Sequence, residues 1–119
     1  MKKIVLGLVF FPLFLIGQTS LTEAQKLIES KQFYKAEKVL ILFVNNNPDN
    51  IQATELLGDA FGYQKKWDDA ITQYKLLVEA KPTEANFHYK YGGALGMKAL
   101  NVSKIRAIGI IGDVKEAFL

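Results

Sequence analysis

The sequence predicts an all-α fold, a helix–turn–helix solenoid, and two observations carry this prediction. Apolar residues recur at helical spacing along most of the chain after residue 20. A small or apolar series precedes both Pro48 and Pro82 at matching offsets. The interval between the two prolines, the repeat period, is typical of stacked helix pairs, in which no unit buries its apolar face alone. The matching residues are Ala36, Leu40 and Phe43 before the first proline, and Ala70, Tyr74 and Leu77 before the second.

The N-terminal segment has the order of an export signal. Met-Lys-Lys is followed by an apolar run from Ile4 to Ile16, a small residue at Gly17 and then polar residues. The run is shorter than the ~20 residues of a permanent membrane span, and Pro12 interrupts it. We therefore expect residues 1–17 to be a signal peptide cut before Gln18, in a periplasmic or secreted protein. An uncleaved membrane anchor is the alternative, whereas a lipoprotein anchor would need a cysteine that the chain lacks.

Charge and composition exclude several classes of function. The chain of 119 residues has a formal net charge of +3, but Lys2 and Lys3 would leave with the signal. The rest carries 13 basic against 12 acidic residues, with no basic stripe that would indicate a nucleic-acid partner. With no cysteine, the chain has neither disulfides nor a thiolate metal site. Its length predicts one small domain.

Residues 18–50 are predicted to form the first helix pair. Ser20 and Glu23 match a capping box at the start of a helix, and apolar residues then follow at helical spacing. The polar stretch 29–32 predicts a turn, and a second helix is expected over residues 33–44. The asparagine-rich stretch around Pro48 ends that helix.

Residues 51–84 are predicted to form the second pair. A helix over residues 51–64 is followed by a Lys-Lys turn and a helix that begins at Trp67. The two aspartates after Trp67 favour a helix start because they complement the helix dipole. Lys81 and Pro82 end this helix.

Residues 85–119 are predicted to form a partial third unit with an insertion. The next helix pattern, residues 113–118, comes about ten residues later than the period requires, so residues 98–109 are extra. We expect Gly109 and Gly112 to form a bend or turn before that last helix. Whether Leu119 is a natural stop or a truncation stays open.

An uncovered apolar face is expected at this end of the chain, because no further repeat or polar cap covers it. We expect the chain to self-associate there, or to be frayed beyond about Ala99. The residues of this face are Ile105, Ile108, Ile111, Val114 and Phe118.

The repeated residues resemble the tetratricopeptide repeat family over nearly the whole chain after residue 17. The resemblance implies a solenoid of about two and a half repeats. The signal and the glycine-rich run at residues 92–96 are similar to exported tetratricopeptide proteins of Bacteroidetes-type bacteria. The second repeat matches through Leu57, Gly58, Phe61, Trp67, Ala70, Tyr74 and Pro82, and the first through Ala24, Leu27, Phe33, Ala36, Leu40 and Pro48. The third matches only through Tyr91, Gly92 and Leu95.

No constellation of residues predicts catalysis, a metal or a cofactor, so we expect no enzyme. The glycines 92, 93 and 96 lack phosphate-loop spacing, and we expect them to allow close helix packing. His88 is the only histidine, which leaves no multi-histidine metal site. We expect it to be a partly buried structural residue.

The family resemblance implies a binding groove on the first helix of each repeat. Glu55 and Asp59 are four residues apart and share one helical face, which suits a partner segment with a Lys or Arg and an apolar anchor. The alternative is that these residues are merely solvated. We expect Asp59→Lys to weaken binding and to leave helicity intact. The predicted groove residues are Gln25, Gln52, Glu55, Asp59, Tyr63, Asn86 and Tyr89, with Leu21, Ile28, Gly93 and Met97 beside them.

The function expected from this sequence is an exported module that binds another protein or peptide through the groove. The alternative is an assembly element whose open C-terminal end packs on a partner or on its own copy. A membrane enters these expectations only through an uncleaved signal.

Overall fold

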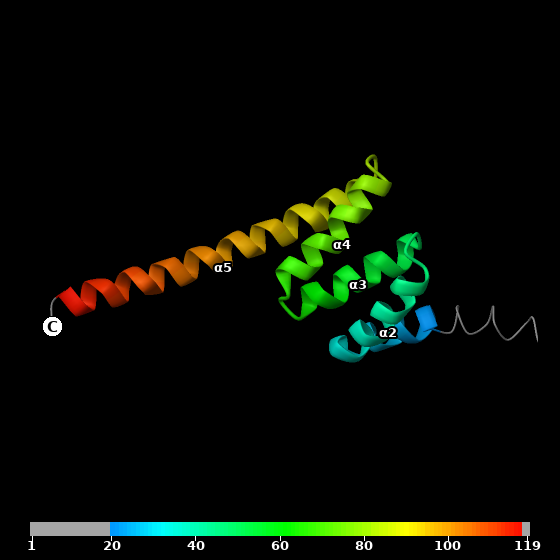
Figure 1. Cartoon of the computed structure of the whole chain (residues 1–119), viewed down its shortest axis with the longest axis horizontal. Helices are drawn as coiled ribbons and strands as arrows, with labels where there is room; N and C mark the ends of the chain where they lie inside the picture. The colour runs from blue at the N-terminus through cyan, green and yellow to red at the C-terminus, as the bar shows by residue number, and fades with distance from the viewer. Residues whose placement is uncertain (1–19, 118–119) are drawn as a thin grey trace, which may run out of the picture.

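The computed structural model describes residues 20–117, with side chains through residue 109, and this part of the chain is all-helical. The predicted signal peptide, residues 1–17, lies outside the described residues. Within residues 20–117, five helices follow one another (Figure 1): residues 20–29, α2 (Phe33–Asn46), α3 (Ile51–Tyr63), α4 (Trp67–Ala80) and α5 (Ala85–Ala117).

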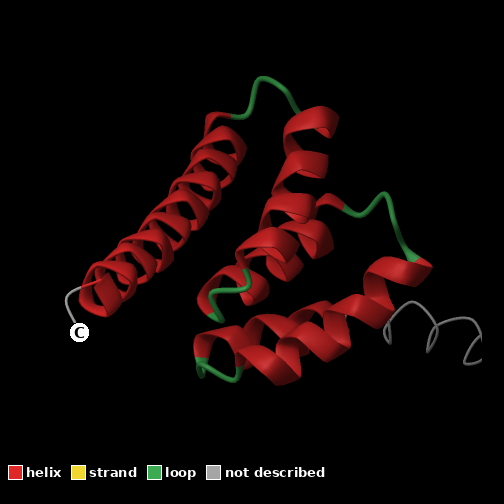
Figure 2. Ribbon diagram, turned by 60° about the vertical axis from the view of Figure 1, so that its left-hand side comes forward, coloured by secondary structure: helices red, strands yellow, loops and turns green. Residues whose placement is uncertain are grey.

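Successive helices pack against each other, with α3 lying between α2 and α4, and α4 between α3 and α5. Short turns join the helices, so the chain reverses direction at each one (Figure 2). The prediction of an all-α fold is confirmed. Helices α2, α3 and α4 each begin at the residue that the sequence pattern predicts.

The backbone repeats itself with the same period as the two prolines. The starts of α2 and α4, Phe33 and Trp67, are separated by this interval, and so are the starts of α3 and α5. The turns before α2 and α4 also share one conformation: Lys31 has φ 62° and Lys65 has φ 61°, the left-handed region that non-glycine residues seldom adopt. The chain therefore turns between its helices in the same way twice.

Alanines at the helix contacts let the backbones approach closely. Ala24, Ala36, Ala60 and Ala70 are fully buried in one continuous core. Between them, larger apolar side chains fill the space, since protein interiors are close-packed. The most buried of these are Leu40 and Leu77.

Gly58 permits the closest contact between α3 and α4. A Cβ atom at this position would lie 2.5 Å from Cε1 of Tyr74, a distance that real Cβ atoms essentially never show. The ring of Tyr74 is itself only 7% exposed. Glycine at position 58 is thus a packing requirement.

An ion pair between the buried Glu37 and the partly exposed Lys66 joins the first helix pair to the second. Glu37 on α2 is 7% exposed and accepts hydrogen bonds from Lys66 Nζ at 2.9 Å and Gln64 Nε2 at 3.0 Å. Both donors belong to the turn between α3 and α4. The carboxylate therefore fixes α2 against this turn.

Helix α5 differs from the prediction in two ways. The expected bend at Gly109 and Gly112 is wrong, because both residues lie inside one continuous helix of 33 residues. The expected close packing at glycines 92, 93 and 96 is also wrong, since a Cβ atom on any of them would meet nothing within 4 Å. In residues 20–109, a helix covers only one side of α5, the side on which α4 packs.

The residues of α5 that face α4 also differ from those expected. Phe87 and Ala94 are buried, at 8% and 4% exposure, and Tyr91 is half-buried. Leu95, one repeat period after the buried Phe61, is 42% exposed. The reason is again the missing neighbour on the second side of the helix.

The last part of α5 runs away from the other helices (Figure 1). An ion pair at 2.6 Å joins Lys98 Nζ to Asp68 near the start of α4. Beyond it Ile105 and Ile108 are 61% and 69% exposed, so for these two residues the expectation of an uncovered apolar face is confirmed. The other three expected members, at positions 111, 114 and 118, lie outside the described side chains.

Candidate functional site

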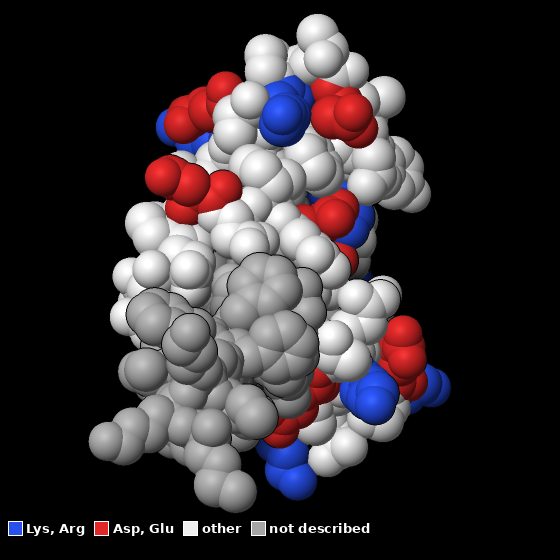
Figure 3. All heavy atoms as spheres, turned by 90° about the vertical axis from the view of Figure 1, so that its right-hand side faces the viewer, with Lys and Arg blue, Asp and Glu red and all other residues white. Residues whose placement is uncertain are grey.

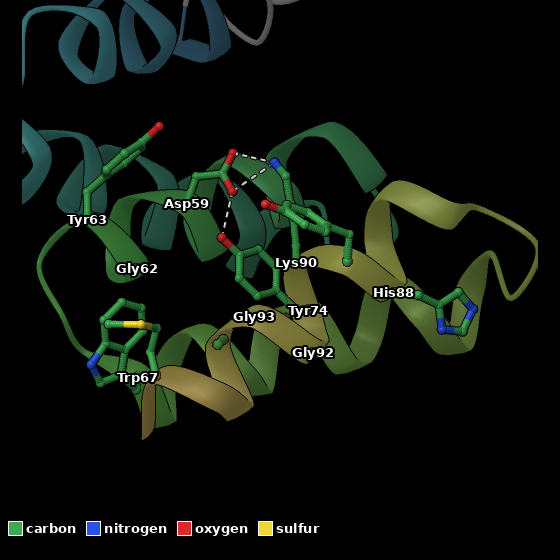
Figure 4. A pocket seen from close by; sticks show the side chains of 12 residues that line it. Asp59, Gly62, Tyr63, Trp67, Tyr74, His88, Lys90, Gly92 and Gly93 are labelled. Carbon is green, nitrogen blue, oxygen red and sulfur yellow. Dashed lines mark hydrogen bonds and ion pairs between the residues drawn. The ribbon is translucent and has the colours of Figure 1, made fainter. Parts of the chain in front are cut away.

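Helices α3, α4 and α5 enclose a hollow of about 820 Å³, open to solvent on one side (Figure 4). Pockets of ~300–1,000 Å³ are the usual size of binding sites in proteins. Tyrosine and tryptophan rings and a methionine contribute to its lining. They are Tyr63 from α3, Trp67 and Tyr74 from α4, and Tyr89 and Met97 from α5.

A polar network crosses one wall of the hollow. Tyr74 donates its hydroxyl proton to Asp59 at 2.6 Å, and Lys90 Nζ lies 2.8 Å from the same carboxylate (Figure 4). Lys90 also contacts Glu55 at 3.1 Å, and Asn86 Nδ2 donates to Glu55 at 3.3 Å. These contacts join one residue of α4 and two of α5 to the carboxylates of α3.

The network shifts two pKa values upward. Burial, followed by the hydrogen bond to Asp59 and its negative charge, raises the pKa of Tyr74 far above its ordinary value. Burial alone would lower the pKa of Lys90, but its hydrogen bonds and ion pairs with Asp59 and Glu55 outweigh burial and raise it. At neutral pH the hydroxyl therefore stays protonated and the ammonium stays charged.

The rim of the hollow carries exposed aromatic and thioether side chains. Tyr63 is 61% exposed, although its ring stacks on Phe33 with 4.6 Å between centroids. Tyr89 is 79% exposed and Met97 is 43% exposed. Large exposed apolar side chains around a concave surface are typical of interaction sites.

The structure divides the predicted groove residues between two places. Glu55, Asp59 and Asn86 lie in the polar network, and Tyr63 and Tyr89 lie at the rim of the hollow. The two remaining predicted residues lie elsewhere: Gln25 and Gln52 border a smaller hollow of about 420 Å³ between the helix of residues 20–29 and α3.

Lys90 is the important residue that the groove prediction omitted. It stands one repeat period after Leu56, so the repeat replaces an apolar residue with a cation at this position. A cation where the preceding repeat has Leu56, one turn after Asn86, was the available signal for a pair with α3.

The two carboxylates share one cation of the chain itself, because Lys90 forms ion pairs with both and offsets one of their two negative charges. Asp59 is only about one-fifth exposed. Asp59→Lys would therefore place a second cation beside Lys90 and remove the acceptor of Tyr74, which costs stability. The expectation of intact helicity assumed an exposed side chain, and this premise is wrong, because Asp59 is partly buried and ion-paired.

His88 is exposed, which corrects the expectation of a partly buried residue. Its Nε2 donates a hydrogen bond to the carbonyl oxygen of Pro82 at 2.6 Å, and so ties α5 to the loop before it. In the described part of the chain, no three His, Asp or Glu residues lie close enough to hold a metal ion.

Acidic and basic side chains are interspersed on the face that Figure 3 shows. None of the described helices is long and apolar enough to cross a membrane.

No protein-family model, no curated protein and no solved structure matches the chain.

Proposed function

We propose that this chain is a tetratricopeptide-type module that binds an extended segment of another protein in the hollow between α3 and α5. The repeated helix starts and the repeated left-handed turn support the repeat assignment. In this proposal α3 and α5 are the first helices of the second and third repeats. The chain then contains two and a half repeats, with α5 extended beyond the usual length.

The single observation that carries the binding proposal is the aromatic lining of the hollow. Apolar and aromatic surface gives most of the binding energy in protein recognition, through a few anchors in desolvated pockets. Tyr63, Tyr89 and Met97 are exposed in the free chain. Their apolar surface would be stabilised by ~25 cal/mol for each Å² that a partner removes from water. An aromatic or aliphatic side chain of a partner segment would cover them.

The polar network favours one sign of charge on the partner segment. Glu55 and Asp59 bring two negative charges and Lys90 one positive charge, so the wall keeps one net negative charge. A basic residue next to the anchor is favoured over an acidic one, because like charges brought together cost free energy. The aromatic rings thus select an apolar anchor, and the charge of the wall adds a preference for a basic residue beside it.

We also propose that the chain is exported and acts by binding, not by catalysis. Export rests on the order of residues 1–17, a charged start, an apolar run and a small residue. Binding is favoured because the charged groups of the hollow, Asp59 and Lys90, are paired with each other, whereas general acid–base catalysis requires a group that faces the substrate.

A peptide-display selection against the purified chain tests the proposal. Peptides enriched on the wild-type chain should share an aromatic or large aliphatic residue with a basic neighbour. Tyr89→Ala should weaken their binding by about tenfold or more, equivalent to ~1.4 kcal/mol. Tyr34→Ala is the matched control, because Tyr34 is 58% exposed on α2 and does not line the hollow.

Two results would refute the proposal. One is a selection that enriches no shared anchor. The other is equal affinity of the enriched peptides for the wild-type chain and for Tyr89→Ala. Circular dichroism of each variant shows whether the fold survives the change.

A further inference from the structure

The hollow has an aromatic zone and a charged zone that follow one another along α3. Glu55, Asp59 and Tyr63 are spaced by four residues in one unbroken helix, so they lie on one side of it, each step being about 6 Å. Tyr63 belongs to the aromatic rim, whereas the two carboxylates belong to the polar network. Figure 4 shows Asp59 between Tyr63 and Lys90. A partner segment that lies along α3 therefore meets the two zones in succession.

Helix α5 forms the other wall and has the same two zones. Lys90 and Asn86 reach across to the carboxylates of α3 and close the space between the helices there. Gly93, which lines the hollow, follows one turn later, and a Cβ atom on it would meet nothing within 4 Å. The space opposite Tyr63 is thus left for the apolar anchor of a partner.

Glu55 is the carboxylate that can accept from a further cation. Asp59 uses both of its oxygens, since Oδ1 accepts from Tyr74 and Lys90, and Oδ2 accepts from Lys90. On Glu55 the contacts with Lys90 and Asn86 are both made by Oε2, and no described residue donates a hydrogen bond to Oε1. The side chain of Glu55 is 26% exposed. An ammonium or guanidinium group of a partner can therefore pair with Oε1.

We propose that the segment bound in the hollow carries its Lys or Arg two positions from its apolar anchor. This inference rests on the function proposed above. Side chains of an extended segment alternate between its two sides, and residues two positions apart lie on one side, about 6.6 Å from each other. This distance matches the step of about 6 Å from Tyr63 to Asp59.

With the anchor in the aromatic zone, the residue two positions away lies over the carboxylates, and its long side chain reaches Oε1 of Glu55. A residue directly adjacent in sequence points to the opposite side of the segment, away from α3. The basic neighbour of the anchor is thus the next side chain on the same side of the segment, not the next residue in sequence.

Three capped peptides of identical composition test this spacing. Each is a short segment of serine and alanine with one phenylalanine and one lysine, placed one, two or three positions apart and made in both orders. Their equal charge leaves only geometry to distinguish them. Trp67 is the only tryptophan of the chain and lines the hollow, so its fluorescence measures occupancy. In the better order, the two-position peptide should bind about threefold more tightly than the others, the size expected for a partly exposed ion pair.

Glu55→Gln removes the charge of the acceptor and keeps its shape. It should weaken binding of the two-position peptide about threefold and leave the other two peptides unchanged, which measures the coupling between the lysine and Glu55. Glu79→Gln is the matched control, because Glu79 is exposed on α4 and does not line the hollow. Circular dichroism checks that both variants stay helical.

The possible failures are distinguishable. Equal affinity of the three peptides for the wild-type chain would overturn the spacing and leave the proposed function standing, since all three carry the anchor. An equal loss for all three peptides with Glu55→Gln would also overturn the spacing, because a general effect of charge prefers no position. No binding of any peptide up to about 1 mM would overturn the proposed function and the spacing with it.

Discussion

At the scale of single residues, two glycines show that the same position in the repeat can have different surroundings. Gly58 and Gly92 occupy the same position of successive repeats, yet the first lies against a ring and the second faces open space. A sequence pattern alone treats the two positions as equivalent. The difference arises from whether a second helix is present to cover the site.

Alanine at these two positions should therefore have opposite effects. Gly58→Ala should lower the free energy of unfolding by ~1–3 kcal/mol, because the new methyl group overlaps Tyr74. Gly92→Ala should raise it by up to ~1 kcal/mol, the difference in helix propensity between the two residues. Urea unfolding of both variants measures this, and a neutral Gly58→Ala would show that α3 and α4 pack less closely than described.

The Tyr74–Asp59–Lys90 network predicts a loss of stability at high pH. The pKa of Tyr74 and that of Lys90 are both raised in the folded chain. The folded state thus holds protons that the unfolded state releases above about pH 10, so the stabilisation is complete at neutral pH and falls as the pH rises further.

Titration of Tyr74 and Lys90 should leave the urea midpoint nearly constant from pH 7 to about 9. It should lower the midpoint between about pH 10 and 11. Tyr74→Phe should be less stable at pH 7, because it lacks the hydrogen bond to Asp59, and should show a shallower fall. A wild-type midpoint that holds steady through pH 11 would count against the network.

Lys90 also marks the limit of sequence reasoning about the site. Helical spacing correctly placed Glu55 and Asp59 on one face, since that follows from 3.6 residues per turn. Whether their charges were free depended on a contact 31 residues away, between Lys90 and Asp59. Local spacing carries no information about such a contact.

At the scale of the helices, capping and turn residues made the first two helix pairs predictable. Asn50 shows why: its side chain accepts a hydrogen bond from the backbone N–H of Ala53 and so fixes the start of α3. Pro48 and Pro82 lie in the two loops between the pairs. The starts of the helices followed from such local interactions.

Helix α5 was mispredicted because a change in repeat period does not itself stop a helix. Residues 85–117 contain no proline, and a glycine within a helix costs only ~1 kcal/mol relative to alanine. Gly109 therefore weakens the helix without ending it. The bend was expected because the next apolar pattern comes later than the repeat period requires. Such a shift changes which residues can pack against a neighbouring helix, but it does not by itself end the helix.

Unequal protection along α5 follows from its contacts. Residues 87–94 pack on α4, whereas residues 103–109 are exposed throughout. Helices without tertiary contacts are marginally stable in water. Backbone amides of residues 103–109 should exchange with solvent at least about 100 times faster than those of residues 90–94. Equal protection in both segments, in a chain that sediments as a monomer, would contradict this expectation.

At the scale of the whole molecule, packed helices present a hollow on one side and an open helix face at the end. The all-α class and the order of α2, α3 and α4 were predictable from periodicity. The hollow was only partly predictable, because it requires side chains from three helices. Trp67 and Tyr74 match the repeat pattern, and the structure shows that they line the hollow.

Export makes a separate prediction for the mature chain. Protein recovered from the cell envelope or the medium should begin at Gln18, because residues 1–17 have the order of a cleaved signal. Mass spectrometry of the intact chain measures this. Recovery of the chain with Met1 from a membrane fraction would support the uncleaved anchor instead.

The central claim is that the hollow binds a segment of another protein, and site-specific photocrosslinking in the source cell tests it most directly. A photoreactive phenylalanine at position 89 lies at the rim of the hollow, and one at position 34 is a matched exposed control on α2. The account predicts that position 89 crosslinks to one recurring segment with an aromatic or large aliphatic residue, and that position 34 does not. Crosslinks that are absent from position 89, or identical from both positions, would contradict it.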